Sequence, residues 1–415
     1  MLRATTWRKL TNSVGALQNI DRLHASRTSF QRVRRFQHES SINSALWEIV
    51  DVPGKGLGVV ARQDIPAGIP IMDETALITA SPGGEEPLRA ALLAQYPTMP
   101  AATQARIHRL FSGVPNHDRS GPAPHTLSNA HAQGTVRFNT FAPFDHVAMT
   151  TGSDASVVPT TGLWSSPSFL NHACNHNAFW HTPAPDRMVV RTVVPVAKGT
   201  ELTIAYRNVH DPFALRTQAL HDRYAMTCAC PVCMADRRVS ESDRAARSAD
   251  MERLSALATN VFEWAAEVDM DAADDEAARG IAEHLDQWLV AHSGPETYRP
   301  HDVRYIQYLL GCVELYVDVD NAGGRSRAAD RIVTALVPTD LRVQWFDEEA
   351  RGSAPDWLFD LIRCVRTAHA FSAQMPVRAQ QALLEHAAKL HDVLFGGGEE
   401  GFRSAFGELA VVEEE

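Results

Sequence analysis

Four cysteines have the spacing of a metal site. Cys228, Cys230 and Cys233 stand within six residues, and Cys174 lies upstream of them. The intervals of one and two residues let one tight turn direct three sulfurs to a common point, while the distant fourth would tie two parts of the chain together. A tetrahedral zinc ion needs four such ligands. The pattern therefore predicts a structural zinc clamp rather than a catalytic metal centre.

The alternatives to the four-cysteine site are clustering by chance, a disulfide and a different ligand set. A disulfide would need an oxidising compartment, and no hydrophobic signal segment precedes the cluster. A different ligand set stays open because His172, Cys174 and His176 share one face of an extended segment. The other two cysteines, Cys312 and Cys364, lie in stretches with helical apolar spacing, so they are predicted to be small core residues.

Charge is unevenly distributed along the 415 residues. Residues 1–38 contain eight Lys or Arg and a single acid, Asp21. An Arg-rich leader with Ser and Thr and few acids is typical of a mitochondrial presequence, and a disordered basic arm or an overextended gene model is the alternative. Residues 1–40 are therefore predicted to be a separate leader. The expected location is mitochondrial if the leader is a presequence, and nuclear or cytoplasmic otherwise.

Outside the leader the chain is acidic. Subtracting residues 1–38 from the totals of 39 basic and 50 acidic residues leaves 31 and 49, a net charge of −18. This charge disfavours direct nucleic-acid binding and favours attraction of a basic peptide. No stretch reaches transmembrane length, so no membrane contact is predicted. Nothing in the sequence predicts an oligomeric state.

Periodicity divides the remaining chain into a β-rich part and a helical part. Short runs separated by turn signals predict small antiparallel strands between Leu46 and Ile78. Residues 81–129 have the character of an insertion, and residues 241–410 have the apolar spacing of a helical bundle or solenoid, with a tetratricopeptide array left open. Within the insertion, helices are predicted over Pro87–Tyr96 and Ala101–Phe111. Further strands are predicted over Val136–Phe141, Met188–Val194 and Glu201–Tyr206. A helix is predicted to run to Tyr224, with Asp211 as its N-cap and Pro212 at its first position.

Four motifs occur in the order found in one enzyme family. They are the turn Gly54-Lys55-Gly56-Leu57-Gly58, the segment Asn171-His172-x-Cys174-x-x-Asn177, the strand from Glu201 to Tyr206, and the segment from Tyr224 to Cys233. With these motifs the chain resembles SET-domain lysine methyltransferases, and its layout is closest to fungal proteins of the SET-and-MYND type. The motifs that carry the resemblance lie within about residues 46–236. The helical tail resembles these proteins only in that it follows the SET domain. Residues 81–129 contain no cysteine, so no MYND zinc finger is expected there.

The resemblance implies an α+β fold. A β-rich SET fold would carry the helical insertion at 81–129 and a post-SET zinc site, and an all-α domain would follow. The implied domains are residues 41–240 for the SET domain with its cysteine cluster and residues 241–415 for the helical C-terminal domain.

The resemblance also implies a cofactor, S-adenosylmethionine. Glycine in the turn would let the backbone pass close to it, and the Asn171 amide with the His172 imidazole would hold its polar groups. Asn139 is a looser match, and Met226 stands where an aromatic residue often packs on adenine, although its thioether can still supply an apolar surface. The residues assigned to the cofactor are Lys55, Gly56, Leu57, Gly58, Asn139, Asn171, His172, Tyr206 and Met226. Taken alone, these features have plainer interpretations as a hairpin turn and a strand-end cap.

Two tyrosines are implied as the catalytic residues. Tyr206 would orient the lysine amine and the methyl donor for in-line displacement, because methyl transfer from a sulfonium needs alignment above all. Tyr224 would line the channel that desolvates the amine and lowers its pKa. Tyr206 alone would otherwise be interpreted as a half-buried aromatic residue at the end of a strand. The family pattern is altered at Ala173, where Ser is familiar, and at His176, where Pro is familiar.

The implied function is transfer of a methyl group from S-adenosylmethionine to lysine side chains of a protein substrate, histone or non-histone. An acidic body suits a basic substrate of either kind. The alternative is a catalytically inactive scaffold that keeps the zinc-stapled fold and binds partners through its helical tail. The altered positions favour the scaffold, whereas the presence of Tyr206, Asn171 and His172 favours the enzyme.

Overall fold

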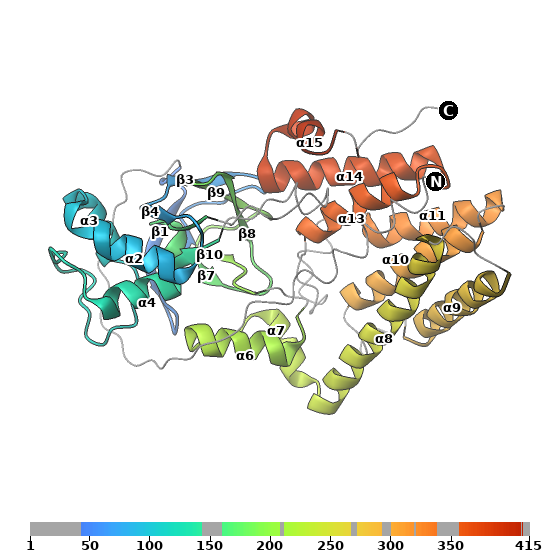
Figure 1. The fold of residues 1–415 in the computed structure, drawn as a ribbon, viewed down its shortest axis with the longest axis horizontal. Coiled ribbons are helices and arrows are strands. Elements are labelled where there is room, and N and C mark those ends of the chain that lie inside the picture. The colour runs from blue at the N-terminus through green and yellow to red at the C-terminus, as the bar shows by residue number, and fades with distance from the viewer. Residues whose placement is uncertain are drawn as a thin grey trace.

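The computed structural model describes residues 43–142, 160–207, 211–266, 272–292, 300–318, 321–337, 357–407 and 409. The predicted basic leader, residues 1–40, lies outside these ranges. Three small sheets occupy one side of the molecule and a group of long helices the other, with α6 and α7 between them at the lower edge (Figure 1). The predicted combination of a β-rich part followed by a helical part is confirmed.

The strands form sheets of four, three and three members. Their orders are β1-β2-β10-β7, β3-β9-β8 and β4-β6-β5. Only β7 and β10 pair in parallel within these sheets; the other strand pairs are antiparallel. The strand bounds are β1 Trp47–Val52, β2 Gly56–Ala61, β3 Pro70–Thr75, β4 Ile78–Ala80, β5 Thr140–Phe141, β6 Thr161–Leu163, β7 Asn171–His172, β8 Ala178–Ala184, β9 Arg187–Thr192 and β10 Glu201–Ile204.

The β1–β2 hairpin shows why the predicted turn forms. Trp47 pairs with Ala61 and Val52 with Gly56, so the turn falls on residues 53–55. Gly54 and Gly56 have φ angles of 74° and 77°, a region that residues with a Cβ rarely adopt. The buried residues of β1 alternate with more exposed ones, which directs one face of the hairpin into the core.

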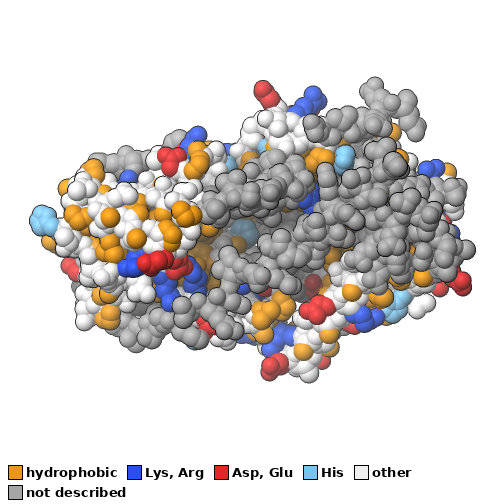
Figure 2. Space-filling view, in the orientation of Figure 1, with side chains coloured by type: hydrophobic (Ala, Val, Ile, Leu, Met, Phe, Trp, Pro, Cys, Tyr) orange, Lys and Arg blue, Asp and Glu red, His pale blue; other side chains and the backbone are white. Residues whose placement is uncertain are grey.

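The insertion between β4 and β5 is helical, as predicted. Its elements are α2 Glu85–Gln95, the 3-10 helix η1 Tyr96–Thr98, α3 Ala101–His108 and α4 Asn129–Asn139. The buried residues Leu88 and Leu92 of α2 share a core cluster with Val136 of α4. Hydrophobic side chains gather over this part of the molecule, at the left of Figure 2.

The predicted strand over Val136–Phe141 is wrong for its first four residues. They belong to α4, and only Thr140 and Phe141 are in a strand. The side chain of Ser128 caps the helix by accepting a hydrogen bond from the main-chain N–H of His131 at 3.2 Å. Burial of Ala132 and Val136 against α2 then outweighs the β propensity of the Val-x-Phe run.

The helix after β10 begins later than predicted. Helix α6 spans Phe213–Tyr224, and its N-cap is Pro212 rather than Asp211. The main-chain carbonyl of Asp211 accepts a hydrogen bond from Nη1 of Arg216 at 2.8 Å. This contact satisfies a carbonyl just before the helix, while no side chain caps the first N–H groups of α6.

Helices make up the described chain from the end of the cysteine segment onward. They are α7 Pro231–Arg238, α8 Glu241–Ala266, α9 Ala272–Ala291, α10 Pro300–Val317, α11 Ala322–Leu336, α13 Trp357–Ala370, α14 Val377–Phe395 and α15 Gly398–Phe406. Cys312 and Cys364 are buried in one hydrophobic cluster with Leu383 of α14, which confirms their predicted place in the core. No helix in the described ranges combines the length and the hydropathy needed to cross a membrane.

Helix α14 packs on the sheet that contains β8 and β9. The rings of Phe179 and Phe395 lie 5.7 Å apart, and Nε of Arg191 donates to the carbonyl of Val393 at 3.2 Å. Val193, just after β9, is buried in the same cluster as the C-terminal helices. The β-rich part and the helical part therefore share one hydrophobic interface.

Replacing Leu383 by Ala should lower the free energy of unfolding by about 2–5 kcal/mol, because its side chain is fully buried in the cluster of C-terminal helices. Leu215 is 63% exposed, so Leu215→Ala should change the same quantity by less than about 0.5 kcal/mol. Urea unfolding followed by circular dichroism measures both. Equal losses in the two variants would contradict the assigned core.

Candidate functional site

The four cysteines meet in space. The sulfurs of Cys174, Cys228, Cys230 and Cys233 all lie within 4.8 Å of one another. None of them is in a disulfide. Zinc bound tetrahedrally at about 2.3 Å would hold sulfurs about 3.8 Å apart, and the separation between the sulfurs of Cys174 and Cys233 is 3.5 Å. The predicted group of four is confirmed as a cluster that could hold a metal ion.

Local structure brings these sulfurs together. Helix α6 ends at Tyr224, and its C-cap Ala225 has a φ of 50°, a left-handed conformation that stops the helix. Cys228 lies in the connection that follows, and Cys230 is the N-cap of α7 with Pro231 at the start of the helix. Cys233 then points back from the first turn of α7 toward Cys174. Proline is favoured at such a position because its φ is already helical and it has no N–H to satisfy.

Hydrogen bonding within the cluster separates the pKa values of the thiols. A hydrogen bond with Cys174 is the main cause that lowers the pKa of Cys230 to about 6. The same partner lowers the pKa of Cys228, and the pKa of Cys174 is raised in return. The four sulfurs are therefore close enough to share hydrogen bonds, and a thiolate is the form in which each would bind a metal.

His172 lies beside the cluster rather than in the group of four. Its Nδ1 accepts from the main-chain N–H of Tyr206 at 3.0 Å. In a neutral imidazole the proton is then on Nε2, which faces the sulfur of Cys174 at 3.4 Å. Among the described residues, the groups that could hold a metal include neither His172 nor His176, so the alternative ligand set is not supported.

The glycine turn and Asn171 lie together. Nδ2 of Asn171 donates to Oε1 of Glu201 at 2.9 Å and to the carbonyl of Leu57 at 3.3 Å. The other carboxylate oxygen of Glu201 forms an ion pair with Nζ of Lys55 at 2.5 Å. A Cβ on Gly58 would lie 2.6 Å from Nδ2 of Asn171, so this approach requires glycine.

Asn177, from the same motif as Asn171, fixes the neighbouring strand. Its Oδ1 accepts from the main-chain N–H of Thr203 at 2.8 Å, and its Nδ2 donates to the carbonyl of Glu201 at 2.8 Å. The Asn177 amide thus makes two hydrogen bonds to the main chain of β10, as a neighbouring strand would. This contact holds Glu201 where it reaches both Asn171 and Lys55.

Tyr206 and Tyr224 are in contact. Their ring centroids lie 4.8 Å apart, and the ring of His172 is 5.4 Å from that of Tyr206. The Tyr206 hydroxyl donates to the carbonyl of Leu170 at 2.6 Å. Met226 packs with both tyrosines against the cysteine cluster. The two predicted catalytic residues therefore lie together beside the cysteines, and their roles stay predictions.

Asn139 has a different environment from the other predicted cofactor residues. It is the last residue of α4 and is buried. Its Nδ2 donates to the carbonyls of Phe111 and Thr135 at 2.8 and 2.7 Å. The amide nitrogen therefore holds the insertion together, and a cofactor role for Asn139 stays a prediction.

Sequence reasoning missed three polar residues near the site. Glu201 joins Lys55 to Asn171, as described above. Nε of Arg223 donates to the Tyr224 hydroxyl at 3.2 Å, and Arg223 also pairs with Glu85 at 2.5 Å. Arg216 is fully buried beside Cys233. Charged residues are ordinarily exposed, whether in a strand such as β10 or in a helix such as α6, so the sequence contained no signal for these contacts.

Comparisons with known proteins agree with this arrangement. The family model of the SET domain matches residues 56–207. The chain is 27% identical over 195 residues to a histone-lysine N-methyltransferase of Schizosaccharomyces pombe, covering 46% of this chain and 52% of that protein. It is 35% identical over 75 residues to a SET and MYND domain-containing protein of Dictyostelium discoideum, covering 18% of this chain and 22% of that protein.

The chain thus spans about half the length of the first of these relatives and about a fifth of the second. The matched range contains the last three residues of the glycine turn, Asn171, His172 and Tyr206, whose side chains and backbone meet in the structure. Residues 56–207 therefore form a SET domain.

Proposed function

We propose that this protein transfers a methyl group from S-adenosylmethionine to a lysine side chain of a protein substrate. The observation that carries the proposal is the contact between Tyr206 and Tyr224 beside His172, with ring centroids 4.8 and 5.4 Å from that of Tyr206. Two phenol rings in contact give an aromatic wall that suits the aliphatic stem and the amine of a lysine.

A cofactor site would lie on the side of Asn171. The Asn171 amide and the glycine turn would hold the amino-acid part, and the apolar surface of Met226 would face the adenine. When bound, S-adenosylmethionine would supply a methyl group activated by its positive sulfur. The remaining assigned residues, Lys55, Gly56, Leu57, Asn139 and His172, are proposed to contact the same molecule.

The work of the protein residues in this reaction is alignment. The Tyr206 hydroxyl is fixed by its hydrogen bond to the carbonyl of Leu170, and its backbone is fixed by His172. A nucleophile held in line with the methyl group gains most of the rate that such a transfer needs. The lysine amine must also be neutral, and a site that excludes water lowers its pKa toward that state.

The cysteine cluster is proposed to hold structural zinc in a post-SET site. Four thiolates satisfy a closed tetrahedral centre, which leaves no position for a substrate. The cluster packs directly against Tyr206, Tyr224 and Met226. Zinc at this point would fix the segment that carries Tyr224 and Met226 against the SET domain.

A basic protein is the proposed substrate class. The chain outside its leader is strongly acidic, which favours encounter with Lys- and Arg-rich surfaces. One relative carries the name histone-lysine N-methyltransferase, so histones are included among the proposed substrates. A catalytically inactive scaffold is the competing function, favoured by the altered positions Ala173 and His176.

Changing Tyr206 to Phe should lower the turnover of methyl transfer by about 10²-fold, because the amine loses its alignment. Binding of S-adenosylmethionine should stay unchanged, since the ring and the His172 contact remain. Incorporation of labelled methyl into histones and cell extract measures turnover, and calorimetry measures binding. Tyr305→Phe in α10 is the matched control.

Equal losses of turnover and cofactor binding in Tyr206→Phe would refute the assigned role. A wild-type protein that neither binds the cofactor nor transfers methyl would support the scaffold.

Changing Gly58 to Ala should weaken binding of S-adenosylmethionine about tenfold, the equivalent of about 1.4 kcal/mol, because the new Cβ displaces the Asn171 amide. Gly280→Ala in α9 is the control, because a Cβ there meets nothing within 4 Å. Calorimetric dissociation constants compare the two. Wild-type affinity in Gly58→Ala would contradict a cofactor site beside Asn171.

Changing Cys230 to Ser should remove most of the bound zinc, which is about one ion per chain in the intact site. Cys312→Ala removes a thiol far along the sequence, in the core of the C-terminal helices, and should leave the zinc content unchanged. Metal analysis of the purified proteins measures both. Wild-type zinc content in Cys230→Ser would refute the four-cysteine site.

A further inference from the structure

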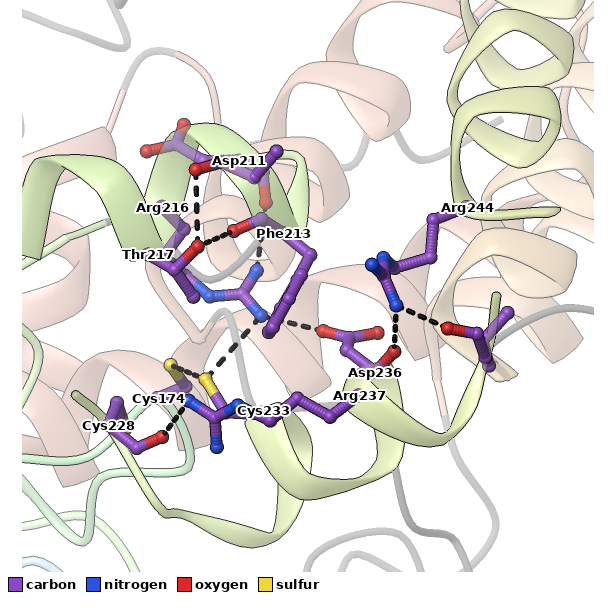
Figure 3. A network of polar contacts seen from close by, with 12 residues as sticks. Cys174, Asp211, Phe213, Arg216, Thr217, Cys228, Cys233, Asp236, Arg237 and Arg244 are labelled. Atoms are coloured by element: carbon purple, nitrogen blue, oxygen red, sulfur yellow. Dashed lines mark hydrogen bonds and ion pairs between the residues drawn. The ribbon is translucent and has the colours of Figure 1, made fainter. Parts of the chain in front are cut away.

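A buried arginine lies against the cysteine cluster. Arg216 of α6 has no exposed surface, and its Nη2 donates to the sulfur of Cys233 at 3.8 Å and to Oδ2 of Asp236 at 2.7 Å. Its Nη1 donates to the carbonyl of Asp211. Figure 3 shows the guanidinium group between the sulfurs and the carboxylate. A fully buried charge is costly unless anions and hydrogen bonds compensate for it.

Two further arginines surround the same site. The ring of Phe213 has the guanidinium carbons of Arg216, Arg237 and Arg244 at 5.8, 5.8 and 4.8 Å from its centroid. Nη2 of Arg237 donates to the carbonyl of Cys228 at 2.7 Å, and Nη1 of Arg244 donates to the carbonyl of Asp236 at 2.8 Å. Arg237 is exposed and Arg244 is partly exposed, so water screens their charges, whereas the buried Arg216 depends on nearby anions.

A zinc-loaded cluster would be anionic. A zinc ion with four thiolates has a net charge of −2 and Asp236 adds −1, so the buried Arg216 would face anions on both sides. Arg216 is fully buried, and its guanidinium contacts both the Cys233 sulfur and the Asp236 carboxylate. The guanidinium is thus placed as a permanent cation against the anionic face of the cluster.

We propose that Arg216 is a positioning residue of the metal site, which stabilises the thiolates by its charge and by a hydrogen bond to the Cys233 sulfur. The inference rests on the proposed zinc site and is independent of methyl transfer. Groups that hydrogen-bond to metal ligands commonly change metal affinity by about 10- to 100-fold. Asp236 would hold the guanidinium of Arg216 in place. Its own negative charge would repel the thiolates and so weaken zinc binding.

Two substitutions at this ion pair separate the proposal from a merely structural role. R216Q should weaken zinc binding about 10- to 100-fold. D236N keeps the shape and an acceptor for Arg216 but removes a negative charge, so its zinc affinity should equal or exceed that of the wild type. The exposed Arg238 on α7 provides the control variant R238Q, which should bind zinc as the wild type does.

Zinc affinity is measured on the full-length chain by competition with a chromophoric chelator, with folding checked by circular dichroism. Cobalt substitution gives a second readout, because loss of a cation and a donor at the sulfur moves the sulfur-to-cobalt absorption band to longer wavelength in R216Q. R216K, which keeps the charge but loses the planar fork of donors, should lie between the wild type and R216Q. It decides the question if R216Q does not fold.

Unchanged zinc affinity in R216Q and R216K, or equal weakening in R216Q and D236N, would overturn the role of Arg216. A wild-type protein that binds no zinc would overturn the proposed metal site and this inference together. A protein that binds zinc as described but transfers no methyl would leave the inference standing and refute the proposed enzyme.

Discussion

The parallel pairing of β7 with β10 is the contact on which the site depends. Its register sets Asn171 beside Thr203 and His172 beside Ile204. Because β10 also pairs with β2, the glycine turn reaches the same edge as Asn171. Because the chain continues past Ile204, the backbone of Tyr206 reaches the imidazole of His172. Two residues of strand pairing thus place the amide, the imidazole and the phenol within one small region.

The cysteine cluster packs against the same group of residues through Tyr206. Cys174 follows β7 directly, so the strand that positions Asn171 also delivers the first sulfur. The other three sulfurs come from the turn and helix after α6, and the same segment contributes Tyr224 and Met226 to the packing around Tyr206. The proposed methyl-transfer residues and the proposed zinc ligands are therefore parts of a single packed unit, and distortion of one set would displace the other.

The sequence predicted the strands around the glycine turn, the insertion helices and the group of four cysteines, because each follows from local periodicity or ligand spacing. It misassigned residues 136–139, where tertiary burial against α2 decides between helix and strand. It also missed the burial of Arg216 and the bridging contacts of Glu201. Those contacts join segments distant in the chain, and a polar residue's type does not reveal which distant partner it will meet.

The packing of α14 on β9 has a consequence for how the protein can be divided. Phe179 and Val193 of the β-rich part are covered by C-terminal helices, and Arg191 is bonded to the backbone of Val393. A fragment that stopped soon after the cysteines would leave these apolar side chains in water and invite self-association. The C-terminal helices thus form part of the hydrophobic core of the sheet, and we expect the SET domain to be well behaved only when it is expressed together with them.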